Sequence, residues 1–163
     1  YPNQISCVIL EPATTEVPKE NFLHKVQELC KKNNAVFIID EMITGFRWDL
    51  KGACHYYNIH PDLATYGKAM ANGFSVAALG GTKEIMELGG IKHKNERVFL
   101  LSSTHGAEMC SLGAFVETVN QYKKLNVVDQ IKYSGDKLIR GFNEIASSLD
   151  LQDHFYVLNI MAI

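Results

Sequence analysis

Short apolar runs alternate with longer amphipathic segments along most of this chain. The short runs lie next to turn-forming residues, as is typical of buried strands, and cover residues 5–10, 36–39, 63–65, 76–80 and 98–101. Apolar positions at helical spacing predict helices over residues 19–33, 83–88, 107–124 and 127–149. Because strands alternate with helices, the predicted fold class is α/β, with a mainly parallel sheet covered by helices.

The first predicted helix has one apolar face. That face is formed by Phe22, Val26, Leu29 and Cys30. Pro18 lies just before the expected start of this helix, where its fixed backbone angle is tolerated. Residues 44–51 and 89–97 are predicted to be loops, and the sequence contains no internal repeat.

Two polar residues near strand ends are the candidates for chemistry. Asp40 follows the run 36–39, so its carboxylate is predicted at the carboxyl end of a buried strand, where ligands bind in open α/β sheets. Lys68 lies on a glycine-flanked turn after the run 63–65. Pyridoxal phosphate chemistry needs such a pair, because a lysine links to the cofactor and an acid pairs with its ring nitrogen.

Other interpretations of these residues stay open at this point. An apolar run ending in Asp40 and Glu41 also resembles the metal-binding strand of a nucleoside triphosphatase. The phosphate-loop pattern of those proteins is absent, since Gly67-Lys68 is followed by Ala69. Taken alone, Asp40 is also consistent with a solvated strand end, and Lys68 with a surface charge.

Taken together, the segments resemble the class III aminotransferases, most closely the branch of glutamate-1-semialdehyde aminomutase. The similarity extends from Glu11 to about Gly141. Its motifs are Asp40-Glu-Met-Ile-Thr-Gly-Phe-Arg47, Pro61-Asp-Leu-Ala-Thr65, Gly67-Lys-Ala69, Asn72-Gly73, Ala77-Ala-Leu-Gly-Gly81 and Ser102-Ser-Thr-His-Gly-Ala-Glu108. The resemblance implies part of the large domain of a fold-type I transferase that depends on pyridoxal 5'-phosphate.

The same resemblance implies roles for individual residues. Lys68 matches the lysine that carries the cofactor, and Asp40 matches the partner of its pyridinium nitrogen. Met42 stands where the family places an apolar residue against the cofactor ring. Thr104 matches a threonine that reaches the cofactor phosphate of the neighbouring subunit, and Ser103 is a weaker candidate for the same contact. The resemblance therefore implies a homodimer with a shared active site.

The implied reaction is the transfer of an amino group from a small-molecule amino donor to a carbonyl acceptor. The alternative is the aminomutase reaction, in which the amino group returns to a neighbouring carbon of the same molecule. Ile43 favours that branch, because many class III enzymes have glutamine at this position. Lys68 and Asp40 serve both reactions, so the substrate stays open.

Three further polar residues have two interpretations each. Arg47 suits bidentate binding of a substrate carboxylate, but we expect a structural ion pair, with Glu41 as the candidate partner. His105 is either close to the phosphate or a packing residue. Glu11 follows the first predicted strand and is expected to cap the turn rather than to line the site.

The chain has 163 residues, whereas members of this family are much longer. We therefore expect an internal part of a larger enzyme, with the glycine-rich phosphate motif in a preceding segment. Residues 1–126 are predicted to be the second half of the large domain, and residues 127–163 the start of the small carboxy-terminal domain, whose first strand would cover 155–160. A further alternative is that this stretch alone is an inactive fragment or fold module.

Composition narrows the remaining classes of function. The net charge of −2 does not suggest a nucleic-acid surface, and no apolar stretch approaches the roughly 20 residues of a membrane span. The four cysteines are scattered without a C-x-x-C pair, which favours reduced thiols and a cytoplasmic protein. The histidines lack the spacing of metal ligands, so no metal site is expected.

Overall fold

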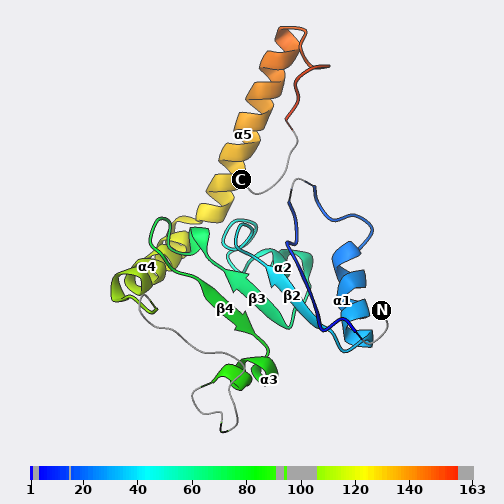
Figure 1. Ribbon diagram of the computed structural model, residues 1–163. Helices are drawn as coiled ribbons and strands as arrows, with labels where there is room; N and C mark the ends of the chain where they lie inside the picture. Colours follow the sequence, from blue (N-terminus) through cyan, green and yellow to red (C-terminus); the bar gives the residue numbers. More distant parts are fainter. Residues whose placement is uncertain (2–3, 15, 91–93, 95–105, 158–163) are drawn as a thin grey trace.

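The computed structural model describes residues 1, 4–14, 16–90, 94 and 106–157. The centre of this described part is a four-stranded sheet whose strands lie side by side in chain order (Figure 1). Strands β1, β2 and β3 are parallel, and β4 runs antiparallel to β3. The strands are β1 Cys7–Leu10, β2 Val36–Asp40, β3 Leu63–Tyr66 and β4 Ala78–Gly81. The predicted α/β class with a mainly parallel sheet is confirmed.

One face of the sheet forms the core with the helices that connect its parallel strands. In β2, Phe37 and Ile39 are buried on this face, whereas the alternate positions are half-buried. Helices α1 (Phe22–Lys32) and α2 (Ala53–Tyr57) follow β1 and β2 in the chain, and both contribute to this core. The buried cluster comprises Leu23, Cys30, Ala35, Phe37, Ile39, Cys54 and Ile59.

Helix α1 differs from its prediction in its start and in its buried face. It begins at Phe22, because Glu20 and Asn21 adopt left-handed backbone angles (φ 51° and 57°) that cannot belong to a right-handed helix. Leu23 and Cys30 are buried, whereas Phe22 and Leu29 are 51% and 58% exposed. Phe22 and Leu29 therefore lie outside the buried core, although the sequence pattern groups them with Cys30.

The segment after β3 contains short elements that lead towards the edge of the sheet. They are the 3-10 helix η1 (Lys68–Met70), helix α3 (Lys83–Met86) and the 3-10 helix η2 (Glu87–Gly89). The helix predicted over residues 83–88 is thus split into α3 and η2. The strand predicted over residues 76–80 is found at 78–81 as β4.

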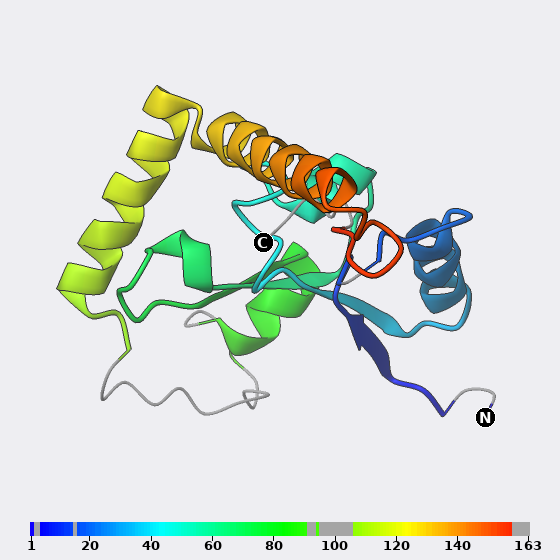
Figure 2. The same ribbon diagram turned by 90° about the horizontal axis from the view of Figure 1, so that it is seen from above.

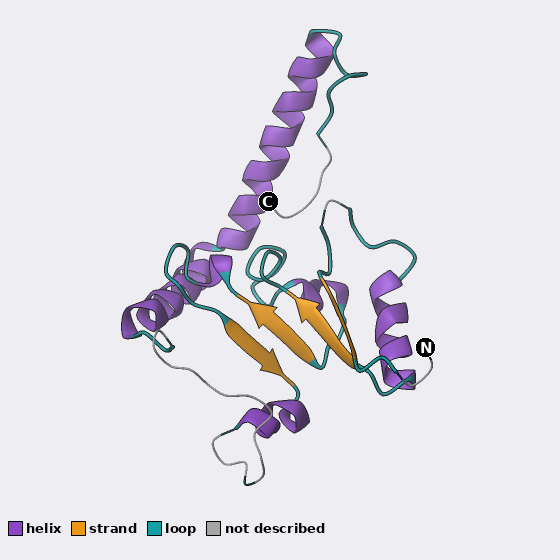
Figure 3. Cartoon of the chain, in the orientation of Figure 1, coloured by secondary structure: helices purple, strands orange, loops and turns teal. Residues whose placement is uncertain are grey.

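Two long helices follow and diverge from a sharp turn. Helix α4 (Met109–Leu125) contacts η1, and α5 (Val127–Ser148) follows after the single residue Asn126. Asn126 closes α4 and opens α5 in a left-handed conformation, with φ 49° and ψ 49°. Figure 2 shows the two helices meeting at this corner, and Figure 3 shows α5 extending clear of the sheet.

Some predictions concern regions that the structure describes only in part. The strand predicted over 98–101 lies outside the described residues. Of the strand predicted over 155–160, residues 155–157 form no strand, and the remainder lies outside the description. The predicted domain boundary between residues 126 and 127 falls at the turn between α4 and α5 and stays a prediction. No helix within the described ranges has the length and apolar character to cross a membrane.

Candidate active site

Asp40 lies at the carboxyl edge of the sheet, with one carboxylate oxygen already held. It is the last residue of β2 and pairs with Thr65 of β3 in the strand register. Its Oδ1 accepts hydrogen bonds from the Thr65 hydroxyl and from the backbone N–H of Met42, both at 2.9 Å. No described residue donates to Oδ2. The half-buried carboxylate is therefore fixed in orientation and keeps one oxygen for an external donor.

Lys68 lies at the same edge, just after β3. Gly67 before it is buried, and Lys68 itself opens η1 with an exposed side chain. Its backbone has φ 44°, a left-handed angle that an L side chain rarely adopts. Among the described residues, no carboxylate forms an ion pair with its ammonium group. The parallel register of β2 and β3 thus brings Asp40 and Lys68 to neighbouring strand ends, as the sequence predicts.

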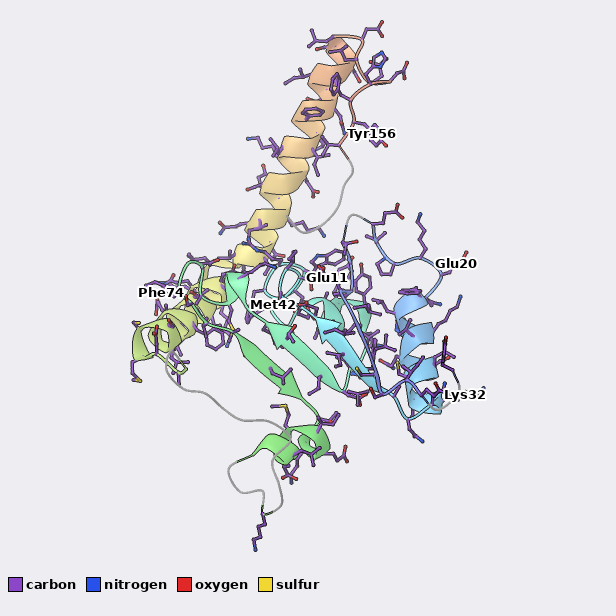
Figure 4. All side chains as sticks on the ribbon, viewed as in Figure 1. Glu11, Glu20, Lys32, Met42, Phe74 and Tyr156 are labelled. Carbon is purple, nitrogen blue, oxygen red and sulfur yellow. The ribbon has the colours of Figure 1, made fainter. Side chains whose placement is uncertain are left out.

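Met42 connects these two strand ends through packing. A Cβ atom built on Gly67 would lie 2.8 Å from the Met42 Sδ atom, which is closer than real carbon contacts allow. Gly67 therefore leaves the space into which the half-buried Met42 side chain packs, next to the backbone of Lys68. Figure 4 shows Met42 at this edge of the sheet.

Glu41 is fully buried, and its carboxylate binds the loop that follows β2. It accepts hydrogen bonds from the Thr44 hydroxyl at 2.7 Å and from the N–H groups of Ala53 and Cys54 at 2.8 and 2.7 Å. The predicted ion pair between Arg47 and Glu41 is wrong, because these three donors hold the carboxylate and no described ion pair joins the two residues. Substrate binding by Arg47 stays a hypothesis.

Sequence reasoning considered Glu41 only as a partner of Arg47. It missed the three donors, because two of them are backbone N–H groups at the start of α2. Burial and the nearby Glu41 carboxylate raise the pKa of the Cys54 thiol well above its ordinary range. Burial, followed by the charges of Glu41 and Cys54, raises the pKa of Tyr66 to about 12. Both groups are therefore harder to ionise in the folded protein than a free thiol and a free phenol.

Aromatic side chains join the loop 44–51 to other elements. The ring of Phe46 makes edge-on contacts with Tyr66 of β3 and with Phe115 and Tyr122 of α4, at centroid distances of 6.1–6.4 Å. Phe46 holds this place with a left-handed backbone angle, φ 61°. The aromatic cluster thus links the strand that leads to Lys68 with the helix that leads to α5.

Of the remaining candidate residues, two lie among the described residues and three lie outside them. Glu11 is exposed directly after β1, at the same edge as Asp40, and Ile43 is 42% exposed on the loop. Thr104, Ser103 and His105 lie outside the described residues, so the proposed phosphate contacts stay predictions. Within the described ranges, no group of three or more acidic, cysteine or histidine side chains is arranged to hold a metal ion.

The chain is similar in sequence to several known proteins. A family described as Aminotransferase class-III matches residues 1–153. The chain is 34% identical over 158 residues to the glutamate-1-semialdehyde 2,1-aminomutase of Francisella tularensis subsp. mediasiatica (strain FSC147), covering 94% of this chain and 36% of that protein. The protein of the same name from Wigglesworthia glossinidia brevipalpis is 48% identical over 90 residues, covering 53% of this chain and 21% of the relative.

The fold is also similar to that of a solved structure. The FumI protein of Sphingopyxis sp. MTA144, in its PLP internal aldimine form, superposes with a TM-score of 0.80 at 20% sequence identity. The match covers 90% of this chain and 35% of that chain. The chain therefore spans little more than a third of the length of the Francisella relative and of the FumI protein.

Proposed function

The chain belongs to the class III aminotransferase family, and from that premise we propose that the protein containing it is a pyridoxal 5'-phosphate enzyme that transfers an amino group between an amino donor and a carbonyl acceptor. The observation that carries the proposal is that Asp40 and Lys68 lie at the same edge of the sheet. Asp40 offers one carboxylate oxygen to which no described residue donates, and Lys68 offers an ammonium group with no described ion-pair partner. These are the groups that a pyridine ring with an aldehyde requires.

The residues at this edge fit that cofactor. The carboxylate of Asp40 is oriented by Thr65 and Met42, so it meets a ring nitrogen without first having to be ordered. Met42 supplies an apolar and polarisable side chain beside the lysine turn, suited to packing against a ring face. The contacts to the phosphate belong to Thr104 and Ser103 in the proposal, together with a segment that precedes this chain.

Each residue has a distinct task in the proposed mechanism. The bound cofactor supplies an electron sink for the charge that develops on the substrate carbon. Lys68 would hold the cofactor, and its Nζ atom would carry the proton between the substrate carbon and the cofactor, as the transfer of an amino group requires. Asp40 would accept a hydrogen bond from the ring nitrogen and favour its protonated form. Met42 packs beside the lysine turn and helps to exclude water.

A second candidate is the glutamate-1-semialdehyde aminomutase reaction, in which both amino positions belong to one molecule. It is favoured by the names of the curated relatives and by an apolar residue at position 43. The two reactions differ in their need for a second substrate. Repeated turnover of an amino substrate without any added carbonyl acceptor supports the aminomutase, whereas a single half-turnover supports the transaminase.

The proposal includes a cytoplasmic homodimer with a shared site, supported by the match of Thr104 to the family motif. In the proposal, this chain contributes the lysine and its acid, and other parts of the full-length protein complete the phosphate cradle. We therefore expect the full-length protein, rather than these 163 residues, to retain the cofactor tightly.

Borohydride reduction tests the central assignment. Reducing the cofactor-loaded full-length protein fixes the cofactor irreversibly to the lysine that holds it, and peptide mapping then identifies that lysine. We expect the label on Lys68, with no label on Lys83, the next lysine along the chain. A label on any other lysine contradicts the assignment.

A further inference from the structure

We propose that Glu41 is a positioning residue that holds Asp40 in its orientation towards the cofactor. The inference rests on the proposed role of Asp40 and adds a residue that does not itself touch the cofactor. Glu41 directly follows Asp40, and its carboxylate is 0% exposed, turned into the protein rather than towards the edge of the sheet. Its contacts connect Asp40 to the base of the loop and to α2.

The first part of the argument is how tightly the Glu41 carboxylate is held. Thr44, Ala53 and Cys54 donate three hydrogen bonds to it at 2.7–2.8 Å, and two of these come from the backbone at the start of α2. Hydrogen bonds to a buried carboxylate are among the stronger ones in proteins. Without the carboxylate, the two backbone N–H groups would be buried without an acceptor. Glu41 is therefore the acceptor that joins the two ends of the loop.

The second part is that the surrounding chain leaves room for this carboxylate and little else. A Cβ atom on Gly52 would lie 2.6 Å from the Glu41 Oε1 atom, and Gly52 has φ 86°, which side chains rarely adopt. The backbone of Glu41 is fixed as well. Its N–H donates to the Thr65 carbonyl at 2.9 Å, and its carbonyl accepts from the Gly45 N–H at 2.9 Å.

The third part is that both groups that orient Asp40 depend on this anchor. Met42 follows Glu41 in the chain, and its N–H is one donor to the Asp40 Oδ1 atom. Thr65 accepts from the Glu41 N–H through its carbonyl and donates to Asp40 through its hydroxyl. A displacement of Glu41 therefore moves the two donors that fix the Asp40 carboxylate, without changing Asp40 itself.

The test compares isosteric changes of acid to amide in the full-length enzyme. The variant is Glu41→Gln, which keeps the size of the side chain but replaces one accepting oxygen with a donating NH₂ group. The control is Asp49→Asn in the same loop. Among the described residues, the Asp49 carboxylate accepts only a local bond from the Lys51 N–H, and it lies 3.8 Å from the exposed His55 ring. Asp40→Asn serves as the reference for a lost ring-nitrogen partner.

The readouts are the pH dependence of the visible absorption of the bound cofactor, kcat, KM and the melting temperature. For Glu41→Gln we expect a spectral pH profile shifted towards that of Asp40→Asn. We also expect kcat to fall by about 10- to 100-fold with KM changed by less than about threefold, as for the loss of one or two hydrogen bonds to a charged group. Asp49→Asn should match the wild type in all four readouts.

A purely structural role would lower the melting temperature of Glu41→Gln while the spectrum and kcat of the folded enzyme stayed like those of the wild type, and that result would overturn the inference. If Glu41→Gln does not fold, Thr44→Val removes only one of the three donors. It should then give a smaller shift of the spectrum in the same direction, and an unchanged spectrum overturns the inference. If Asp40→Asn itself keeps the wild-type spectrum, the proposed function fails rather than the role of Glu41.

Discussion

The carboxylate of Asp40 shows how a single residue can be prepared for a ligand before the ligand arrives. One oxygen is bound by Thr65 and Met42, and the other has no described donor. The sequence predicts that Asp40 and Lys68 share an edge of the sheet, because each follows an apolar strand in a parallel arrangement. It does not predict which oxygen is held, since that depends on a hydroxyl and a backbone N–H that come together only in the fold.

Replacing Asp40 with alanine tests this residue directly. We expect Asp40→Ala in the full-length enzyme to retain the cofactor on Lys68 but to lose about 10²–10⁴ in kcat, because the charge partner of the ring nitrogen is removed. Steady-state kinetics and the visible spectrum measure the two effects separately. Turnover close to that of the wild type would exclude the assigned role.

Cys54 gives a prediction about pH. Burial and the Glu41 carboxylate raise the pKa of its thiol in the folded protein, whereas the unfolded thiol ionises near ~8.5. The folded state therefore holds a proton that the unfolded state releases, so this contribution to stability is complete below about pH 8.5 and decreases as the pH rises above it. In Cys54→Ala, we expect the free energy of unfolding to decrease less steeply between about pH 8 and about pH 10.5 than in the wild type. Urea unfolding at several pH values measures this difference.

The control for that experiment is Cys110→Ala, which removes an exposed thiol from α4. Its unfolding free energy should depend on pH as that of the wild type does. Equal pH dependence in all three proteins would contradict the role given to Cys54.

At the scale of elements, hydrophobic periodicity located the longer helices and all four described strands but not every connection. Helix α2 was missed, because five residues following a loop are too short to display a helical repeat. The direction of β4 was also beyond the sequence, since alternation along a strand carries no information about parallel or antiparallel pairing. The start of α1 was displaced by two left-handed residues that composition alone does not reveal.

The aromatic cluster around Phe46 predicts a coupling between elements. Phe46→Ala should lower the free energy of unfolding of the full-length protein by about 1–3 kcal/mol, less than a fully buried phenylalanine because this ring is half-buried. Chemical denaturation measures the change. Phe46→Tyr keeps the ring contacts with Tyr66, Phe115 and Tyr122 and should lie within about 1 kcal/mol of the wild type. Equal losses in the two variants would show that the ring contacts are not the cause.

At the scale of the whole molecule, the described chain leaves apolar side chains exposed on the sheet and on α5. Ile9 on the sheet is 59% exposed, and Leu138 and Ile145 on α5 are 75% and 62% exposed. Such surfaces are expected of a chain that spans 36% of the length of a relative. The phosphate contacts proposed for Thr104 also belong to this scale, because the match implies a contact with the other subunit.

Mixing two full-length variants tests the shared site. In Lys68→Ala dimers both sites lack the lysine, and in Thr104→Ala dimers both lack the threonine. If each site takes Lys68 from one subunit and Thr104 from its partner, a mixed dimer places both lesions in one site and leaves the other whole. Activity should then recover towards one working site per mixed dimer. Verified subunit exchange without any recovery would argue against sharing.

The turn at Asn126 has a mechanical consequence for this architecture. Helix α5 has 22 residues, which at the usual rise makes an arm about 33 Å long. A rotation of only about 10° at its base therefore moves its far end by about 6 Å, so small torsional changes are amplified along the arm. Asparagine accepts the left-handed angle at this pivot, and the Gln130 side chain braces it by donating to the Leu125 carbonyl at 2.6 Å. The backbone angles of Asn126 and the hydrogen bond of Gln130 thus determine the direction of α5 and of its apolar side chains.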